Sequence, residues 1–432
     1  MIMRRLTVLA AAVVLIACGS DSDPADTSTS SSPPGTTTAT TGPAGEAVRL
    51  EPSEGVERSR PDERAPVAEL VAGFNDAGFQ LMGDQAPGDN LVFSPLSIGH
   101  ALLMARGAAD EATGAAIDGL FSLPDGRAAH EAWNALDQAM AHAAEAEEDL
   151  TLSVADRIWP DLDVEPDQGW IDLLASEHGA SVEVLDLQGD PEGSRDTINA
   201  WVSDRTQELI PELLPEGFID TNTLLVLTDA IYFEASWRRP FGKYPEEEGS
   251  FTTVGGSEVD VSFMHELELV APRGEGDGFR GAEIPYVGGE YSMLVLVPEE
   301  GRFEEVRDRL GQDLLDEIDS SFTEADYELF LPKWDDHTDL DLMPWLEEAG
   351  AAPGSYPLIA PPAFLGGAVH GADISVDEEG TVAAAATGLA FEESAAPQPE
   401  FTLRADRPFL YLIRHRPSGA VLFAGQVTDP TS

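Results

Sequence analysis

The sequence predicts one α+β domain that follows an apolar leader and a polar tether. The chain has 432 residues, of which 42% are hydrophobic, so it can form a large buried core. Stretches with helical spacing dominate its first half, and strand-like runs dominate its second half. This order favours an α+β fold over a repeating βαβ fold. Neither an internal repeat nor a second linker interrupts the pattern, so we expect a single domain.

The leader, Met1–Ala17, resembles the signal of a bacterial lipoprotein. Its apolar run is too short for a comfortable transmembrane span. The run ends in Leu15-Ile16-Ala17-Cys18, which is similar to a lipobox, where the signal is cut before a cysteine that then carries lipid. We therefore expect a lipidated Cys18 and an extracytoplasmic protein, either anchored to the outer face of the cell membrane or secreted. An ordinary signal peptide or a short anchor with a stray cysteine is the alternative.

The tether is expected to cover residues 18–63. It is rich in Ser, Thr, Pro, Gly and Asp and has few large apolar residues. Such a segment cannot bury enough apolar surface to offset the entropy of ordering it. We therefore predict that it is disordered, and that the folded domain spans residues 64–432.

The first elements of this domain are predicted to be helices. Apolar residues recur at helical spacing along Val67–Leu81. Ser94 and Pro95 before an apolar run predict a helix start, with Ser94 as N-cap and Pro95 at the first helical position. Thr113 is expected to cap the next helix, and Glu131–Glu148 to form an alanine-rich helix.

Strands are predicted later in the chain. Leu224–Phe233 is almost continuously apolar, which is typical of a central strand buried on both faces. Ile284–Pro298 has two β-rich pieces around a Gly-Gly pair, which predicts a hairpin. Arg302–Ile318 returns to helical spacing. The remaining predicted strands are Tyr327–Leu331, Phe409–Ile413 and Val421–Val427.

Charge and cysteine content exclude several classes of partner and site. The formal net charge is -56, and a surface this acidic repels nucleic acid and anionic lipid head groups. The acidic residues are spread along the chain, which favours a role in solubility or in adaptation to high salt. Cys18 is the only cysteine, so neither an intramolecular disulfide nor a multi-cysteine zinc site can form.

Common catalytic motifs are absent from the sequence. It contains no Gly-x-Ser-x-Gly elbow, no His-Glu-x-x-His and no phosphate-binding Gly-x-x-x-x-Gly-Lys loop. Its eight histidines show no metal-ligand spacing, and His100, His130 and His142 are interpreted as surface or packing residues of helices. We expect no catalytic residue, no metal and no cofactor. A hydrolase with a dispersed catalytic triad is one alternative.

A series of short stretches along the chain matches the pattern of one known family. They are Asn90–Ile98, Leu224–Phe241, Ile284–Tyr286 with Ser292–Leu294, Leu331–Trp334, Ala368–His370, Val376–Thr381, Arg407–Phe409 and Leu422–Gly425. Each stretch alone is weak, but their number and order over most of the chain are specific. From about residue 64 to Pro430 the chain therefore resembles the serpin family, with the stretches in the family's order. The resemblance implies a monomeric single domain with about eight to nine helices around three β-sheets and an exposed reactive-centre loop.

The family's mechanism implies a protease inhibitor that is consumed in the reaction. A serine protease cuts the exposed loop and forms a covalent acyl-enzyme. The loop then enters the main sheet as an extra strand and distorts the protease before deacylation. The resemblance thus implies a target serine protease, held in a covalent complex, as the partner.

The composition of the loop's hinge suits such an insertion. An inserted strand sends alternate side chains into the core, and a proline or an unpaired charge would oppose it. Gly380–Phe391 contains neither, and the alternate residues Thr381, Ala383, Ala385 and Thr387, which would share the inward face, are all small. Thr381 is expected to be the first large side chain that moves from solvent into the sheet. The hinge residues are Glu378, Gly380, Thr381, Ala383, Ala385 and Thr387.

The resemblance also implies a cluster of residues that controls the opening of the sheet. Its polar members lie under the main sheet, and its tryptophan lies where the loop enters. The matching positions are Ser94, Ser97, Asn199, His370 and Trp237. Asp156 and Asp229 depart from the family, which commonly has asparagine there. A buried aspartate needs good partners or a proton.

In inhibitory serpins the scissile bond lies a nearly fixed distance past the hinge glutamate, so the resemblance implies where this chain would be cut. Counting seventeen residues with Glu378 as the first ends at Ser394, which predicts cleavage between Ser394 and Ala395. Glu393 and Phe391 are the alternatives. No lysine or arginine occurs from Glu378 to Leu403, so elastase-like or subtilisin-like proteases fit better than trypsin-like ones. A non-inhibitory serpin that acts as a surface binding module is the second alternative function.

Overall fold

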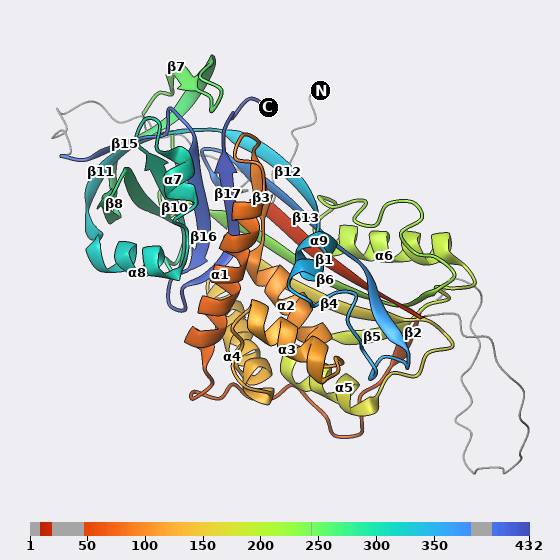
Figure 1. Ribbon diagram of the computed structural model, residues 1–432. Helices are drawn as coiled ribbons and strands as arrows, with labels where there is room; N and C mark the ends of the chain where they lie inside the picture. Colours follow the sequence, from red (N-terminus) through yellow and green to blue (C-terminus); the bar gives the residue numbers. More distant parts are fainter. Residues whose placement is uncertain (1–8, 20–46, 243, 382–399) are drawn as a thin grey trace, which may run out of the picture.

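The computed structural model describes residues 9–19, 47–242, 244–381 and 400–432. Within these ranges the chain forms two sheets, and helices lie beside both of them (Figure 1). The α+β architecture is as predicted. Three sheets were expected, and hydrogen bonding joins the strands of the described part into two.

The helices of the described part agree with the predicted early region. Ser94 caps the helix α2 (Pro95–Arg106) by accepting a hydrogen bond from the Ser97 N–H. Pro95 is the first helical residue, as predicted. Thr113 is not a cap, because Asp110 takes that place and accepts a bond from the Thr113 N–H. The helices are α1 (Val67–Asp84), α2 (Pro95–Arg106), α3 (Glu111–Leu120), α4 (Arg127–Glu145), α5 (Gln168–Leu173), the π-helical turn η1 (Leu174–His178), α6 (Pro191–Arg205), α7 (Phe303–Arg307), α8 (Gln312–Ser321) and α9 (Met343–Glu348).

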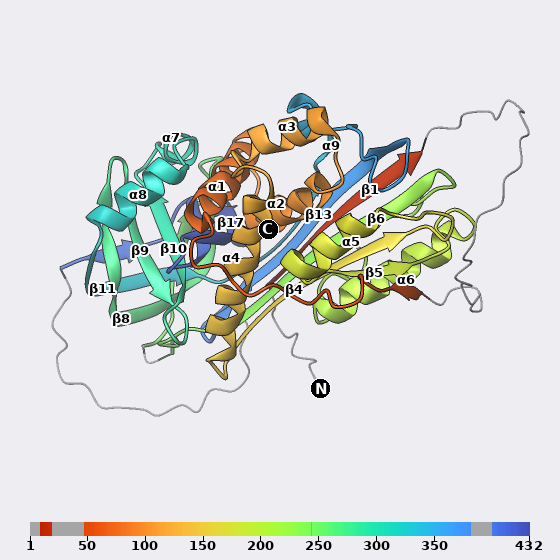
Figure 2. The same ribbon diagram turned by 90° about the horizontal axis from the view of Figure 1, so that it is seen from below.

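The sheet of eight strands is called the main sheet below. It contains the predicted central strand Leu224–Phe233 as part of β6 (Thr223–Ser236). Its path runs β12-β13-β1-β6-β4-β5-β2, with β14 paired to β6 beside this path. Figure 2 shows β13, β1 and β6 lying side by side along it. Its strands are β1 (Leu9–Gly19), β2 (Val48–Leu50), β4 (Leu150–Pro160), β5 (Ser181–Val184), β6 (Thr223–Ser236), β12 (Trp334–Asp341), β13 (Ala363–Val376) and β14 (Gly380–Thr381).

The second sheet has nine strands and includes the predicted hairpin, formed by β9 and β10. The predicted helix Arg302–Ile318 is two helices, α7 and α8, separated by a loop. The strands of this sheet are β3 (Leu91–Phe93), β7 (Glu247–Thr252), β8 (Glu258–Gly276), β9 (Phe279–Pro285), β10 (Tyr291–Pro298), β11 (Thr323–Pro332), β15 (Thr402–Arg404), β16 (Phe409–His415) and β17 (Ala420–Val427).

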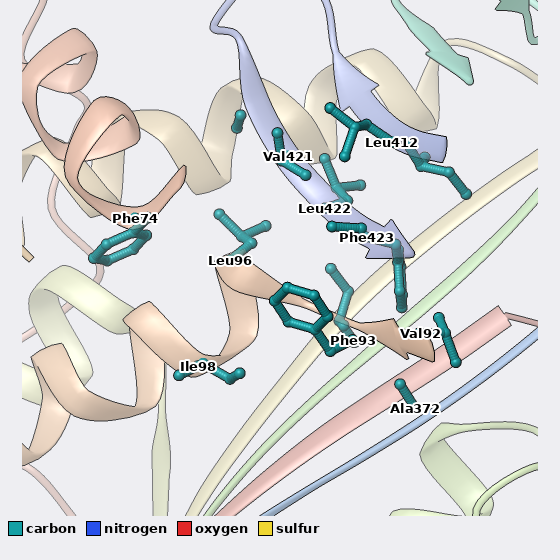
Figure 3. Packing of buried hydrophobic residues seen from close by; sticks show 14 of the residues in the cluster. Phe74, Val92, Phe93, Leu96, Ile98, Ala372, Leu412, Val421, Leu422 and Phe423 are labelled. Atoms are coloured by element: carbon teal, nitrogen blue, oxygen red, sulfur yellow. The ribbon is translucent and has the colours of Figure 1, made fainter. Parts of the chain in front are cut away.

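Buried apolar side chains form two clusters, one on each face of the main sheet. The larger cluster joins α1 to α4 with the main sheet and the second sheet. Part of it is seen in Figure 3, where Phe74 of α1 and Leu96 of α2 lie near Leu422 of β17. The smaller cluster lies on the opposite face, where Ile198 and Val202 of α6 pack on β6. The main sheet is therefore buried on both faces at its centre.

The ordered part of the chain begins before residue 64, which differs from the predicted tether. β2 pairs with β5, and the Ser53 N–H donates to Asp172 at 2.8 Å. Arg58 bonds to Asn134 at 2.6 Å and to Asp137 at 2.7 Å. The prediction of disorder is therefore wrong for residues 47–63, because polar side chains bind them to the body. Residues 20–46 lie outside the described part.

Candidate functional site in the main sheet

The segment predicted to be the signal peptide lies in the middle of the main sheet. β1 pairs antiparallel with β6 on one side and with β13 on the other. Val13 lies between Asp229 of β6 and His370 of β13 in this register. We call the position between β6 and β13 the slot. β1 runs antiparallel to both neighbours, so β6 and β13 run parallel to each other on either side of it.

β1 is apolar on both of its faces, as a central strand must be. Val13, Leu15 and Ala17 belong to the larger core cluster, and Val14 and Ile16 belong to the cluster under α6. The side chains of these five residues are at most 3% exposed. The apolar run that indicates a signal peptide therefore also satisfies the requirements of a doubly buried strand. None of the described helices is long and apolar enough to cross a membrane.

The start of the predicted loop already lies on the sheet. In β14, Gly380 pairs with Ser236 and Thr381 pairs with Ala235. Thr381 is fully buried, and its hydroxyl is 2.7 Å from the hydroxyl of Tyr286. The expectation that Thr381 enters the sheet from solvent is therefore wrong, because the first hinge threonine is already paired and buried.

Trp237 lies where the loop joins the sheet, as the resemblance implies. Its indole stacks on Tyr286 with the ring centroids 4.5 Å apart. The indole N–H donates to the Asp377 carbonyl at 3.0 Å, and its backbone N–H donates to the Glu379 carbonyl at 3.0 Å. The carboxylate of Glu378 accepts a hydrogen bond from Lys333 at 2.8 Å. These contacts direct the chain from the end of β13 onto β6.

Gly380 is required for the close approach of this turn to β6. A Cβ atom on Gly380 would lie 2.3 Å from the Ala235 carbonyl oxygen and 2.9 Å from the Ser236 Cα. Both atoms belong to the backbone of β6, so they cannot move aside as a side chain could. Glycine at this position thus lets the hinge pair with the sheet.

The start of α2 bridges the two strands that flank the slot. The Ser94 N–H donates to His370 Nε2 on β13 at 3.0 Å. The Ser97 hydroxyl donates to a carboxylate oxygen of Asp229 on β6. Ser94, Ser97 and His370 are thus brought together as predicted. Asn199 is not part of this group, because its amide bonds to the backbone of Leu214 beneath α6.

Asp156 and Asp229, which depart from the family pattern, share a buried histidine. The two aspartates are opposite each other on β4 and β6. His100 Nδ1 lies 2.5 Å from Asp229 and 3.4 Å from Asp156. Burial alone would lower the pKa of His100, but the two carboxylates raise it to about 9. Burial raises the pKa of Asp156 to about 6, against the opposing effect of His100. An imidazolium between two carboxylates therefore occupies this position at neutral pH.

Two further histidines continue from His100 in a buried chain. His100 Nε2 is 2.8 Å from His178 Nδ1, and His178 Nε2 is 2.8 Å from His130 Nδ1. Burial lowers the pKa of His178 and lowers that of His130 to about 3, so both rings are neutral. The charged His100 therefore donates to His178, which donates to His130.

The group of His100, Asp156 and Asp229 offers three ligand atoms within 4.8 Å of one another, a spacing that could hold a metal ion. A proton accounts for the same arrangement, because His100 Nδ1–H can bond to both carboxylates. The interpretation of His100 and His130 as surface or packing residues of helices missed this group and the histidine chain that continues from it. The sequence shows only that these histidines lie in α2 and α4. It does not show that His100 packs against aspartates of β4 and β6.

The remaining predicted site residues lie outside the described part of the chain. They are Ala383, Ala385 and Thr387 of the hinge and the cleavage candidates Phe391, Glu393, Ser394 and Ala395. The backbone of Cys18 lies in β1, where it pairs with Thr223 and Phe364. Tyr286 follows β9 and contacts the hinge residue Thr381 through its hydroxyl. The sequence analysis included Tyr286 only as part of a stretch that resembles the family and gave it no role of its own.

Comparison with known proteins identifies relatives across almost the whole folded part. The family model described as "Serpin (serine protease inhibitor)" matches residues 72–430. A serpin-like protein of Methanosarcina acetivorans is 30% identical over 353 residues, covering 79% of this chain and 82% of that protein. Leukocyte elastase inhibitor A of Rattus norvegicus is 30% identical over 374 residues, covering 82% and 96%.

Solved structures show the same fold. The native thermophilic serpin tengpin aligns with a TM-score of 0.74 and 22% identity, covering 89% of this chain and 100% of that one. The native Arabidopsis AtSerpin1 aligns with a TM-score of 0.70 and 25% identity, covering 85% and 99%.

Proposed function

This chain belongs to the serpin family, and on this premise we propose that it inhibits extracytoplasmic serine proteases by cleavage and insertion of its reactive loop. The protease attacks a loop peptide bond, and its serine becomes esterified to the new carboxyl end. The loop then fills the slot as a strand before water can hydrolyse the ester. The protein itself is a consumed substrate and not a catalyst.

The observation that carries this proposal is the slot. The main sheet holds a complete strand between β6 and β13, with both faces buried. The hinge already pairs with β6 next to this position and points along it. A loop that continues from Thr381 would add hydrogen bonds to both neighbouring strands. It would also bury small side chains, which stabilises the inserted state.

The register of β14 supports the predicted scissile bond. Thr381 pairs with Ala235, and each further loop residue moves one residue back along β6. Glu393 would then lie opposite Thr223, where β6 begins, and Ser394 would lie just beyond it. An inserted strand that ends at Ser394 therefore uses the full length of β6. This agrees with cleavage between Ser394 and Ala395.

The composition of the loop supports elastase-like or subtilisin-like targets. It offers no basic side chain for an acidic specificity pocket. The rat relative is named as an inhibitor of leukocyte elastase. We also propose that Cys18 carries lipid in the mature protein and holds it at the outer face of the membrane, where such proteases occur.

The filled slot also favours a second candidate, a non-inhibitory serpin that acts as a surface binding module. A sheet that already contains its central strand has no place for the loop. This candidate predicts that proteases cut the loop without being trapped.

The test uses protein processed by a bacterial host and purified from its membrane fraction. It is incubated with elastase-like, subtilisin-like and trypsin-like serine proteases and analysed by denaturing gel electrophoresis. We expect a covalent complex with the first two classes, and mass spectrometry should place the cut at Ser394-Ala395. Cleavage without any complex would contradict inhibition and favour the binding module.

A further inference from the structure

β1 occupies the positions on β6 that an inserted reactive loop would need. Thr381 pairs with Ala235, so Ala383, two residues further on, would lie opposite Phe233. Leu9 already pairs with Phe233. A loop that continued along β6 in the direction of β14 would run in the same direction as β1, so each further loop residue would meet a position that β1 occupies.

β1 is also the more apolar of the two competing strands. In this register Gly388 would take the position of Val14, and Ala390 that of Ile16. Val14 is fully buried and Ile16 is 2% exposed. The larger side chains of β1 bury more apolar surface than the loop residues can, so β1 binds the slot more favourably. It also needs no loop cleavage to reach the slot.

We propose that β1 is an internal plug, which keeps the full-length chain in a non-inhibitory state until residues 1–17 are removed. This inference rests on the proposed inhibitory function. Hydrolysis of the Ala17–Cys18 bond by a signal peptidase consumes one water and leaves a carboxylate on Ala17 and an amine on Cys18. It removes nine of the eleven residues of β1. The slot is then open for the loop.

The folded full-length chain protects the bond whose cleavage would activate it. Ala17 is 3% exposed, and Cys18 is paired with strands on both sides. A peptidase needs an extended and accessible segment, so it must act before β1 is inserted. The order of cleavage and folding therefore decides whether the product is an active inhibitor or a plugged one.

The experiment compares full-length chains that differ only in β1. Val14→Pro removes a hydrogen-bond donor from a strand that is paired on both sides. Val13→Asp places a carboxylate in the core, opposite Asp229. Both variants should expel β1. Thr38→Pro, which lies outside β1, is the matched control for the added proline.

Two readouts are measured on each chain. The first is the number of moles of chain consumed per mole of elastase-like protease inactivated. We expect this ratio to be at least about tenfold lower in the two β1 variants. Such a change corresponds to about 1.4 kcal/mol in the difference between the activation free energies of loop insertion and of deacylation. The second is hydrogen exchange of the β6 and β13 amides that face the slot. These amides should be protected in the wild type and in Thr38→Pro and should exchange in the β1 variants.

The outcomes separate this inference from the proposed function. Equal trapping and equal exchange in all four chains would overturn the plug and leave the inhibitor intact. If the β6 and β13 amides exchange faster in the β1 variants but no protease is trapped, the plug is supported and the inhibitory function is contradicted. Unchanged exchange in folded variants would show that β1 does not fill the slot. Addition of a peptide with the sequence of residues 9–19 should restore the block to Val14→Pro, and a peptide of reversed sequence should not.

Discussion

Replacing the two aspartates that face each other on β4 and β6 tests the charged group beneath the main sheet. Asp156→Asn/Asp229→Asn keeps side chains of the same shape, and the amide oxygens can still accept from His100 and Ser97. It removes both negative charges that hold the His100 proton. Burial, which lowers the pKa of His100, then acts without opposition. We expect His100 to be neutral above pH 6.5 in this variant.

The magnitude follows from the pKa of His100 in the folded chain. Its ordinary value is 6.5, and the folded value is about 9. Because the folded value is raised, the stabilisation is complete below pH 6.5 and is lost as the pH rises through about 9. At about 1.4 kcal/mol per pH unit, the loss amounts to about 3 kcal/mol. The raised pKa of Asp156 and the lowered pKa values of His130 and His178 act below this window.

The assay is urea unfolding from pH 6.5 to 9, supported by NMR titration of the histidine rings. Hydrogen bonding to Asp373 raises the pKa of His337 to about 9 as well, so all chains carry His337→Gln. The parent should lose stability across the window, and Asp156→Asn/Asp229→Asn should not. Asp84→Asn/Asp204→Asn, which removes two exposed charges, should behave as the parent does. An equal decline in the double-asparagine variant would refute the reasoning.

Three further predictions concern the hinge, the helix cap and the loop. Thr381→Val leaves the buried Tyr286 hydroxyl without its partner and should cost about 1–3 kcal/mol of unfolding free energy, and adding Tyr286→Phe should restore most of it. Ser94→Ala removes the α2 cap and should cost about 1 kcal/mol by the same measurement. In the Val14→Pro background, Ala385→Arg would bury a cation opposite Ile231, which is 1% exposed, and should greatly raise the inhibitor consumed per protease inactivated. Gln398→Arg adds the same charge beyond the scissile bond and should leave that ratio unchanged, and an equal ratio in both variants would argue against insertion.

Local pattern determined those parts of the molecule that depend on neighbouring residues. The continuous apolar run of Leu224–Phe233 predicted β6, because a strand buried on both faces needs apolar side chains throughout. Ser94 and Pro95 predicted the start of α2, because capping depends on the next few backbone N–H groups. Thr113 was misassigned since Asp110, three residues earlier, offers a competing acceptor. The ordered family stretches predicted the fold.

The sequence by itself thus determined the family, the central strand and the small side chains of the hinge, all of which are properties of contiguous segments. Only the tertiary structure decided which segment fills the slot. The apolar run of Leu9–Gly19 suits a buried strand as well as a signal sequence, but its partners β6 and β13 lie more than two hundred residues away. The same holds for His100 and Asp229, which meet because α2 packs on β6. A local sequence pattern shows which secondary structure a segment can adopt. Tertiary packing decides which other segments it pairs with.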